Sequence, residues 1–331
     1  MSIARVSVIG AGAWGTALSL IACRAGRATK LYARREVLIR QLADTRENAD
    51  YLPGITLPDA LQLTPDLAVA LDADAVLYAQ PAQHFRAFCA AVQPFWRKNA
   101  ALVLCAKGIE QSSGLLLHEI AAETLSGARV TTLSGPSFAS DVARGLPTAV
   151  AIAGEDEELV ESLMLALSHG AFRPYGATDL VGVEVAGAVK NVLAIACGMV
   201  MGAGLGDNAR AALITRGLAE VSRLVLAKGG RAETMMGLAG LGDLVLTCSS
   251  PKSRNMSLGM ELGQGRALAD ILAARKSVAE GVTTAPAVVT LARKLGVEMP
   301  IAEAVNRILH LGSSLGAEVE GLLSRPLRRE N

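Results

Sequence analysis

Short apolar runs alternate with helix-length amphipathic segments through the first half of the chain. Most of these runs are continuous Val, Leu, Ile and Ala, which is typical of strands that are buried on both faces. Strand–helix–strand repetition of this kind predicts a parallel sheet with helices on both sides. The runs are Arg5–Ile9, Thr29–Ala33, Ala75–Ala79, Ala101–Cys105, Val130–Leu133 and Thr148–Ala153.

The pattern changes after about Gly176. From Asp179 onward the apolar positions follow helical spacing interrupted by Gly and Pro, and no further strand is expected. We predict a long helix from near Thr178. Pro286 and Pro300 are each expected in the first turn of a helix, where the missing N–H of proline is tolerated.

A chain of 331 residues is long enough for two domains of about 150 residues each. We predict an α/β fold in which a Rossmann-type, mostly parallel sheet domain (residues 1–176) precedes an all-helical substrate and catalytic domain (residues 177–331). The 32 Lys and Arg residues nearly balance the 31 Asp and Glu residues. This balance argues against a nucleic-acid partner or a basic membrane-surface protein, because both rely on clustered cations.

Neither membrane insertion nor a disulfide scaffold is expected. The longest uncharged stretches, Val6–Cys23 and Asn191–Gly206, are interrupted by glycines and are shorter than the roughly 20 apolar residues that a span needs. The N-terminal apolar run leads directly into glycines, which is unlike a secretory signal. The five cysteines form no C-x-x-C pair, as expected of reduced thiols, and we expect a cytoplasmic protein.

A dinucleotide fingerprint, G-x-G-x-x-G, spans residues 10–15, between the first predicted strand and a helix. Gly10 would allow the tight turn, Gly12 would let a pyrophosphate approach the backbone, and Gly15 would let the helix pack on the strand. The N-terminus of the helix would add free N–H groups. Although a glycine-rich turn without a ligand is the alternative, the context favours cofactor binding by this segment, Ala13 included.

The end of the second predicted strand bears on the choice of cofactor. NAD sites usually carry an acid there that binds the ribose 2′-hydroxyl, whereas this chain has Arg34 and Arg35 followed by Glu36. Two guanidinium groups suit a 2′-phosphate, so NADP(H) is favoured. NAD(H) use stays possible if both arginines are solvated and Glu36 binds the ribose.

A single cation, Lys190, lies in the otherwise apolar segment Val183–Val200, where Asn191 is its polar neighbour. Burial would lower the pKa of this lysine towards neutrality, as a general acid or base requires. The alternative is a lysine that reaches solvent from the edge of a helix. The flanking residues offer no polar face, which favours the functional interpretation.

A glycine-rich segment, Gly237–Asp243, ends in an acid, with Thr247 one helical turn later. Ser253, Arg254 and Asn255 then form a compact donor cluster that suits a phosphate. A surface loop is the alternative for both segments.

Two more segments, Ser134–Ala139 and Lys107–Gly108, follow predicted strands. Ligands of open α/β sheets bind outside the carboxyl ends of the strands, so both segments are candidates for the site.

No metal and no nucleophilic catalysis are predicted. The four histidines lack metal-ligand spacing. The G-x-S-x-G match at residues 312–316 follows a helical segment and has no later His or Asp to complete a hydrolase triad.

Together these segments resemble one family along nearly the whole chain, the soluble bacterial NAD(P)-dependent glycerol-3-phosphate dehydrogenases. The resemblance implies a homodimer that reversibly reduces dihydroxyacetone phosphate to sn-glycerol 3-phosphate for glycerophospholipid synthesis. The matching segments are GAGAWGTAL (10–18), AKGIE (106–110), SGPSFA (134–139), GAVKNVLAIACG (187–198), NARAALITRGL (208–218), GLAGLGDLVLTC (237–248), SRN (253–255) and VAEGV (278–282).

The resemblance also implies individual roles, with Lys190 as the catalytic proton donor and acceptor. The implied substrate contacts are Lys107, Gly135, Ser137, Lys190, Asp243, Ser253, Arg254 and Asn255. The implied cofactor contacts are Trp14, Arg34, Arg35, Lys107, Ala139, Arg254, Val278 and Glu280. The chain departs from the family at Tyr78–His84, where Val-Pro-Ser is more usual, so the contacts of this segment are left open.

Two other functions are weighed against this one. Hydroxyacid and 6-phosphogluconate-type dehydrogenases also join a Rossmann domain to helices and use a Lys and Asn pair. A dinucleotide-sensing regulator without chemistry would need the fingerprint but not Lys190, and would usually carry a nucleic-acid or partner-binding segment. No basic helix of that kind stands out in the sequence.

Overall fold

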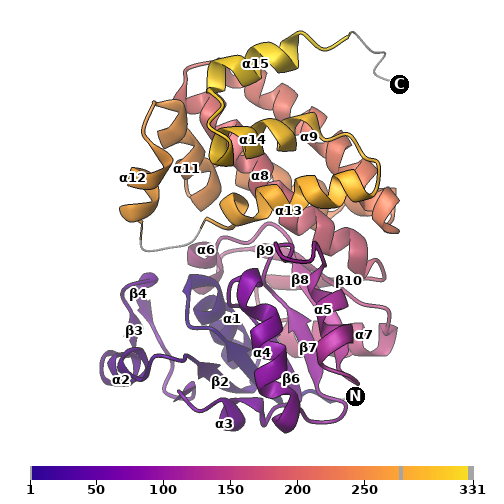
Figure 1. Cartoon of the computed structure of the whole chain (residues 1–331). Coiled ribbons are helices and arrows are strands. Elements are labelled where there is room, and N and C mark those ends of the chain that lie inside the picture. The colour runs from indigo at the N-terminus through magenta and orange to yellow at the C-terminus, as the bar shows by residue number, and fades with distance from the viewer. Residues whose placement is uncertain (1, 276–278, 327–331) are drawn as a thin grey trace.

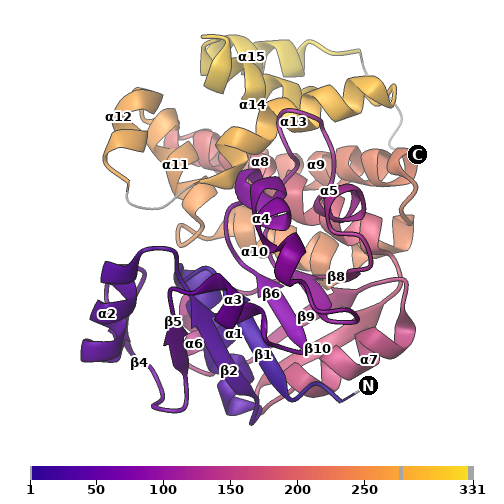
Figure 2. The same cartoon turned by 60° about the horizontal axis from the view of Figure 1, so that its bottom comes forward.

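The computed structural model describes residues 2–275 and 279–326, so Val278, an expected cofactor contact, lies outside the described residues. The first half of the chain forms a sheet covered by helices, and the second half is helical. Figures 1 and 2 show the helical part packed against one end of the sheet part. This architecture confirms the predicted fold class.

The first part is built on one eight-stranded sheet, in the order β10-β9-β8-β7-β6-β1-β2-β5, with a separate antiparallel hairpin of β3 and β4. Neighbouring strands of the sheet are parallel, except that β8 and β9 are antiparallel. The strands are β1 Arg5–Ile9, β2 Ala28–Tyr32, β3 Glu47–Asn48, β4 Leu52–Thr56, β5 Gln62–Thr64, β6 Ala75–Tyr78, β7 Ala101–Leu104, β8 Arg129–Ser134, β9 Thr148–Ala153 and β10 Phe172–Ala177.

Helices cover both faces of this sheet, because successive side chains of a strand point to opposite faces. The helices are α1 Ala13–Arg24, α2 Glu36–Thr45, α3 Leu67–Leu71, α4 Phe85–Val92, α5 Leu117–Thr124, α6 Ala139–Ala143 and α7 Glu157–Leu167, with short 3₁₀ turns η1 Ala82–His84 and η2 Gln93–Phe95. In β1, Val6 and Val8 pack with α1, α2, α6 and α7, whereas Ile9 packs with α3, α4 and α5.

The apolar pattern of the sequence does not predict β10, β5 or the β3–β4 hairpin. β10 lies at the edge of the sheet and contains Pro174 and Gly176. An edge strand tolerates proline, because the N–H that proline lacks can face away from the sheet. The sequence of β10 therefore does not show the apolar pattern of a buried strand. The strand ends at Ala177, and the first helix of the second part begins at Leu180.

The helical part surrounds one long apolar helix, α8. Its elements are α8 Leu180–Gly202, α9 Gly206–Lys228, η3 Ala232–Met236, η4 Leu238–Gly242, α10 Asp243–Ser249, α11 Arg254–Gly263, α12 Leu268–Ala273, α13 Glu280–Lys294, α14 Pro300–His310 and α15 Leu315–Leu323. α8 is long and apolar enough to cross a membrane, but 94% of its apolar window is buried within the fold. It is therefore the core helix of this part of the protein.

Close packing of α11 on α8 depends on glycines of both helices, among them Gly198 and Gly259. A Cβ atom on Gly198 would lie 2.1 Å from the carbonyl oxygen of Met256, and one on Gly259 would lie 2.2 Å from that of Ile195. Neither position could hold a side chain without moving the helices apart. This contact brings the start of α11 beside the middle of α8, where Lys190 lies.

One helix prediction is confirmed and another is wrong. Pro300 is the first residue of α14, as expected. Pro286, in contrast, lies inside α13, six residues after its first residue, Glu280. Proline is usually excluded from the interior of a helix, which favours Pro286 as a helix start. The helix instead begins at Glu280, within the preceding VAEGV segment.

Candidate active site

A large cleft follows the carboxyl edge of the sheet and continues into the helical part. Its volume is about 1240 Å³. It is lined by residues that directly follow β1, β2, β6 and β7, and on the opposite side by residues of α8, α10, α11 and α13. The predicted candidates from the two halves of the chain therefore face one another across a single cleft.

The fingerprint lies at the end of β1, where Gly10, Gly12, Ala13 and Trp14 line the cleft. Gly12 precedes the first residue of α1, and a Cβ atom there would meet nothing within 4 Å, so the backbone is open to a ligand. Gly15 does not line the cleft: a Cβ atom there would lie 1.8 Å from the Gly10 carbonyl oxygen, as expected for helix–strand packing. This cradle fits a dinucleotide pyrophosphate.

At the end of β2, Arg34 and Arg35 also line the cleft. A guanidinium nitrogen of Arg35 lies 3.4 Å from the Tyr51 hydroxyl oxygen. Glu36, the alternative ribose ligand, pairs with Arg40 one helical turn later and is not among the described residues that line the cleft. The charge at this end of the cleft is therefore positive.

Lys190 lies in the middle of α8, is only 7% exposed and lines the cleft. Its ammonium group donates to Asp243 Oδ1 at 2.8 Å and to the Thr247 hydroxyl at 2.7 Å. Burial lowers the pKa of Lys190 to about 8, although the Asp243 carboxylate opposes the shift. The alternative of a lysine that reaches bulk solvent from a helix edge is wrong for this side chain.

Asp243 joins two lysines from different parts of the chain. Its Oδ2 accepts from Lys107 at 2.6 Å while its Oδ1 accepts from Lys190. Burial alone would raise the pKa of Asp243, but the two ammonium groups outweigh it and hold the pKa below its usual value. Asp243 is placed by η4, a single π-helical turn that leads directly into α10.

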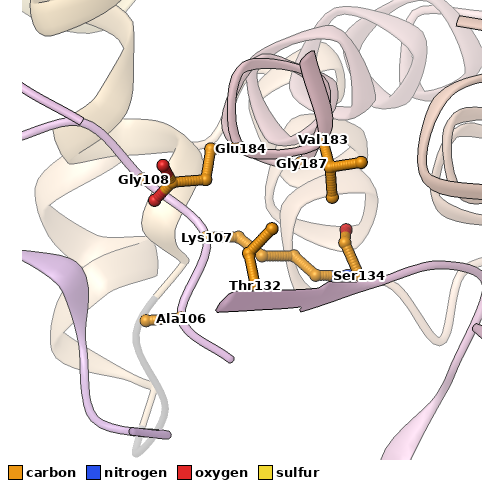
Figure 3. A pocket seen from close by; sticks show the side chains of 8 residues that line it. All are labelled: Ala106, Lys107, Gly108, Thr132, Ser134, Val183, Glu184 and Gly187. Atoms are coloured by element: carbon orange, nitrogen blue, oxygen red, sulfur yellow. The ribbon is translucent and has the colours of Figure 1, made fainter. Parts of the chain in front are cut away.

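Lys107, which pairs with Asp243, also lines a small cavity between the two halves of the chain. Figure 3 shows its side chain beside Thr132 and Ser134 of β8 and close to Gly187 of α8. A Cβ atom on residue 187 would lie 3.1 Å from Ser134 Oγ and 3.6 Å from Lys107 Cγ. The cavity that remains is about 10 Å³, and the absence of a side chain at Gly187 leaves room for Ser134 Oγ beside the lysine stem.

The SRN segment begins α11 at the cleft, and all three of its residues line it. Ser253 caps the helix, since its hydroxyl accepts from the Met256 N–H at 3.2 Å. The Asn255 side chain is held from two sides: its Nδ2 donates to Asn191 Oδ1 at 2.9 Å, and its Oδ1 accepts from the Gly281 N–H at 3.0 Å. These contacts leave the Arg254 guanidinium as the cation that the segment presents to a ligand.

The other expected contacts divide into two groups. Ser137, Ala139 and Glu280 line the cleft, whereas Gly135 does not. The Gly135 carbonyl oxygen instead accepts from Lys107 Nζ at 3.5 Å and from the Ser137 hydroxyl at 2.9 Å. Burial raises the pKa of the Glu280 carboxyl, against the opposing charges of nearby cations.

Two cleft residues named from the sequence, Thr247 and Gln80, had no role assigned to them. Thr247 holds Lys190, and its spacing of one helical turn from Asp243 was the available signal. Gln80 follows β6 and lines the cleft within the unassigned Tyr78–His84 segment, and a Cβ atom on Gly10 would lie 2.9 Å from its Cγ. The departure from the family pattern marks the segment that holds Gln80, but no motif in it indicates a role for this residue. Among the described residues no group of His, Cys, Asp and Glu is arranged to hold a metal ion.

Comparisons with known proteins agree on one family. The model of the NAD-dependent glycerol-3-phosphate dehydrogenase N-terminus matches residues 5–160, and that of the C-terminus matches residues 179–320. Proteins named glycerol-3-phosphate dehydrogenase [NAD(P)+] from Parvibaculum lavamentivorans and Caulobacter vibrioides are each 56% identical, over 98% and 100% of both chains. The crystal structure of the glycerol-3-phosphate dehydrogenase from Coxiella burnetii is 38% identical with a TM-score of 0.94, covering 98% of this chain and 99% of that one.

The similarity extends through both parts of the chain and includes the cleft between them. The chain belongs to the NAD(P)-dependent glycerol-3-phosphate dehydrogenase family.

Proposed function

We propose that this chain catalyses the reversible, NAD(P)H-dependent reduction of dihydroxyacetone phosphate to sn-glycerol 3-phosphate. The observation that carries the proposal is the buried Lys190–Asp243–Lys107 cluster, which lies in the same cleft as the dinucleotide fingerprint and Arg254. A regulator without chemistry would not need a buried ammonium group held by two acceptors.

Lys190 would act as the general acid. When bound, the dinucleotide supplies the hydride that reduces C2 of the substrate. The Lys190 ammonium would stabilise the negative charge that develops on the C2 oxygen and donate its proton to it. A pKa of about 8 suits both directions, because protonated and neutral forms are accessible near neutral pH.

The neighbouring residues would bind and orient. Asp243 and Thr247 fix the direction of the Lys190 ammonium, and Lys107 adds positive potential. Arg254 would hold the substrate phosphate, with Ser253 and Asn255 supporting its helix turn, so that the carbonyl group is positioned for reaction. Ser137 would complete the substrate site, and the Gly135 carbonyl oxygen would hold Lys107 from outside the cleft.

We assign NADP(H) as the favoured cofactor, with NAD(H) possible. Arg34 and Arg35 line the end of the cleft nearest β2, where the adenosine ribose of a dinucleotide on this sheet would lie. Trp14, Ala139 and Glu280 would contribute the remaining contacts. Glu36 is occupied by Arg40, which supports the phosphate-binding interpretation over ribose binding by the acid.

We also propose a cytoplasmic homodimer, with a sheet domain of residues 1–176 and a helical domain from residue 177. All five cysteines are free thiols, which suits a reducing compartment. In the helical part Val221, Leu224 and Val225 belong to the core, while Leu226 is 54% exposed and available to a partner surface. The product would supply glycerophospholipid synthesis.

The test is loss of reduced-nicotinamide absorbance with purified protein and dihydroxyacetone phosphate, run in parallel with NADPH and NADH. Rapid oxidation that disappears with unphosphorylated dihydroxyacetone is the expected result. Activity on a non-phosphorylated hydroxyacid would favour another dehydrogenase. No oxidation by a protein that binds the cofactor would favour the regulator.

A further inference from the structure

The proline inside α13 removes a hydrogen bond from the part of the helix that enters the active site. In a regular helix the N–H of residue 286 would donate to the carbonyl oxygen of Val282, four residues earlier. Pro286 has no N–H, and its ring pushes that carbonyl group outward from the helix axis. The Val282 carbonyl group must therefore find another donor.

That donor comes from a different helix. Nε2 of His310, the last residue of α14, lies 2.9 Å from the Val282 carbonyl oxygen. Because a carbonyl oxygen only accepts, Nε2 of His310 carries the proton. The α14 imidazole thus replaces the backbone N–H that the sequence of α13 lacks.

The turn held in this way carries groups of the active site. Glu280, two residues before Val282, lines the cleft. The N–H of Gly281 donates to Asn255 Oδ1 at 3.0 Å, and Asn255 in turn donates to Asn191 Oδ1 at 2.9 Å. A Cβ atom on Gly281 would lie 2.6 Å from the Asn191 carbonyl oxygen, so the turn packs directly on α8.

We infer that His310 is a positioning residue for the reaction: it holds the first turn of α13, and with it Glu280 and the Gly281–Asn255 contact, in place of the helical hydrogen bond that Pro286 removes. His310 itself lies on the exposed side of the helical part and is not among the described residues that line the cleft. Its effect on the reaction would pass through α13. The kinetic readout rests on the proposed reductase activity.

The decisive experiment is a double-mutant cycle, because the proposal makes the role of His310 depend on Pro286. Four variants are compared with the wild type: His310→Ala, His310→Gln, Pro286→Ala and the double variant Pro286→Ala/His310→Ala. Alanine at 286 restores an N–H aimed at the Val282 carbonyl group, which makes the imidazole redundant. Glutamine at 310 keeps an N–H donor at similar reach.

The readouts are kcat, the KM for NADPH and the KM for dihydroxyacetone phosphate, each measured separately. A hydrogen bond contributes about 0.5–1.5 kcal/mol, which corresponds to roughly a two- to thirteenfold change. Because the family resemblance implies that Glu280 contacts the cofactor, His310→Ala should raise the KM for NADPH by this factor, with kcat within about twofold. His310→Gln should stay near the wild type. In the Pro286→Ala background, loss of His310 should change the KM by less than about twofold.

An equal loss in both backgrounds would overturn the inference, because a residue that acts only by packing does not depend on the donor at 286. An unchanged KM in His310→Ala would overturn it as well. Amide hydrogen exchange gives a readout independent of turnover: exchange at Gly281 should be faster in His310→Ala and restored in the double variant. If the wild type bound NADPH but did not reduce dihydroxyacetone phosphate, the proposed function would fail while the exchange result would still decide the role of His310.

Discussion

Lys190 Nζ lies 2.8 Å from Asp243 Oδ1, and both residues are buried. The carboxylate shares its second oxygen with Lys107, so two ammonium groups compete for one negative charge. A buried ammonium group that shares its carboxylate with a second cation has a lower pKa than one that has a carboxylate to itself. With a pKa of about 8, Lys190 is mostly protonated at neutral pH and can donate its proton to the substrate.

The pH dependence of catalysis follows from this pair. Reduction needs the Lys190 ammonium, so kcat/KM for dihydroxyacetone phosphate should fall as pH rises through about 8. Asp243 raises the pKa of Lys190, so Asp243→Asn should move this limb to lower pH and lower the maximal rate. Thr247→Val removes a hydrogen bond but no charge and is the matched control.

The measurement is a pH–rate profile for each of these variants, with Lys190→Ala as the reference for lost acid catalysis. That reference should lose about 10²–10⁴-fold in kcat while its affinity for NADPH, followed by fluorescence titration, survives. A limb at the same pH in Asp243→Asn and in the wild type would contradict the electrostatic account.

Arg254→Ala should chiefly raise the KM for dihydroxyacetone phosphate. A charge-assisted hydrogen bond contributes about 1.5–3 kcal/mol, which corresponds to roughly a 10- to 150-fold loss. Lys252→Ala is the control, since Lys252 also lines the cleft but already pairs with Asp141. The phosphate assignment would be rejected if steady-state kinetics showed the same KM in Arg254→Ala and in the wild type.

The choice between NADPH and NADH should depend on Arg34 and Arg35. Replacing both by alanine should raise the KM for NADPH at least tenfold and leave the KM for NADH within about twofold, because only NADPH carries the 2′-phosphate. Arg97→Ala is the matched control, since Arg97 is an exposed arginine that pairs with Asp72 and is not among the described residues that line the cleft. Equal losses with both cofactors would show that the arginines bind another part of the dinucleotide.

The sequence predicted which residues form the site better than it predicted the contacts that hold those residues in place. A lone cation in an apolar helix, a fingerprint after a strand and an acid after a glycine-rich turn each carry a local signal, and the structure brings Lys190, Gly12 and Asp243 into one cleft. The apolar runs in the first half of the chain also predicted the sheet, because buried parallel strands are continuously apolar. The helical spacing of apolar residues after them predicted the helical part.

Features that depend on contacts between distant segments were not predictable in this way. The sequence of β10 contains Pro174 and does not look like that of a strand until its position at the edge of the sheet is known. Pro286 looks like a helix start until His310, from another helix, is seen to satisfy the carbonyl group that the proline leaves free. The partners of Asn255 are likewise defined only by the packing of three helices.

Gly187→Ala should lower activity without lowering stability. Alanine is better than glycine in a helix by about 1 kcal/mol. The added Cβ atom, however, would lie 3.1 Å from Ser134 Oγ, which must move by a few tenths of an ångström, and in ordinary contact, at 3.6 Å, with Lys107 Cγ. The displaced Ser134 side chain should in turn crowd the lysine stem beside it. We expect kcat/KM to fall about three- to tenfold with an unchanged or higher Tm.

The control for this variant is Gly321→Ala in α15, where an added Cβ atom meets nothing within 4 Å. It should raise stability by a similar amount and leave kcat/KM unchanged. Full activity of Gly187→Ala would mean that the position of the Lys107 stem does not limit catalysis.

Glu220 should make the protein less stable as pH rises towards neutrality. Its carboxyl group is 2% exposed and accepts from the N–H groups of Ile301 and Ala302, at 2.9 and 3.4 Å, in the first turn of α14. Burial raises its pKa from 4.5 to about 7, although these two N–H groups favour the carboxylate. The folded protein therefore prefers the protonated acid more strongly than the unfolded chain does.

The sign of the effect follows from this order of pKa values. The stabilisation from protonated Glu220 is complete below pH 4.5, decreases as pH rises and is lost above about 7, a difference of roughly 3 kcal/mol. Glu220→Gln does not titrate, so the free energy of unfolding of the wild type minus that of the variant should fall between pH 4.5 and 7 and then stay constant. Urea unfolding at pH 5, 6, 7 and 8 measures this difference.

Calorimetry at pH 6 in buffers of different ionisation enthalpy provides a second test. The wild type should release more protons on unfolding than Glu220→Gln, because Glu220 loses its proton when the chain unfolds at this pH. Equal release from both proteins would exclude Glu220 as the source of the pH dependence.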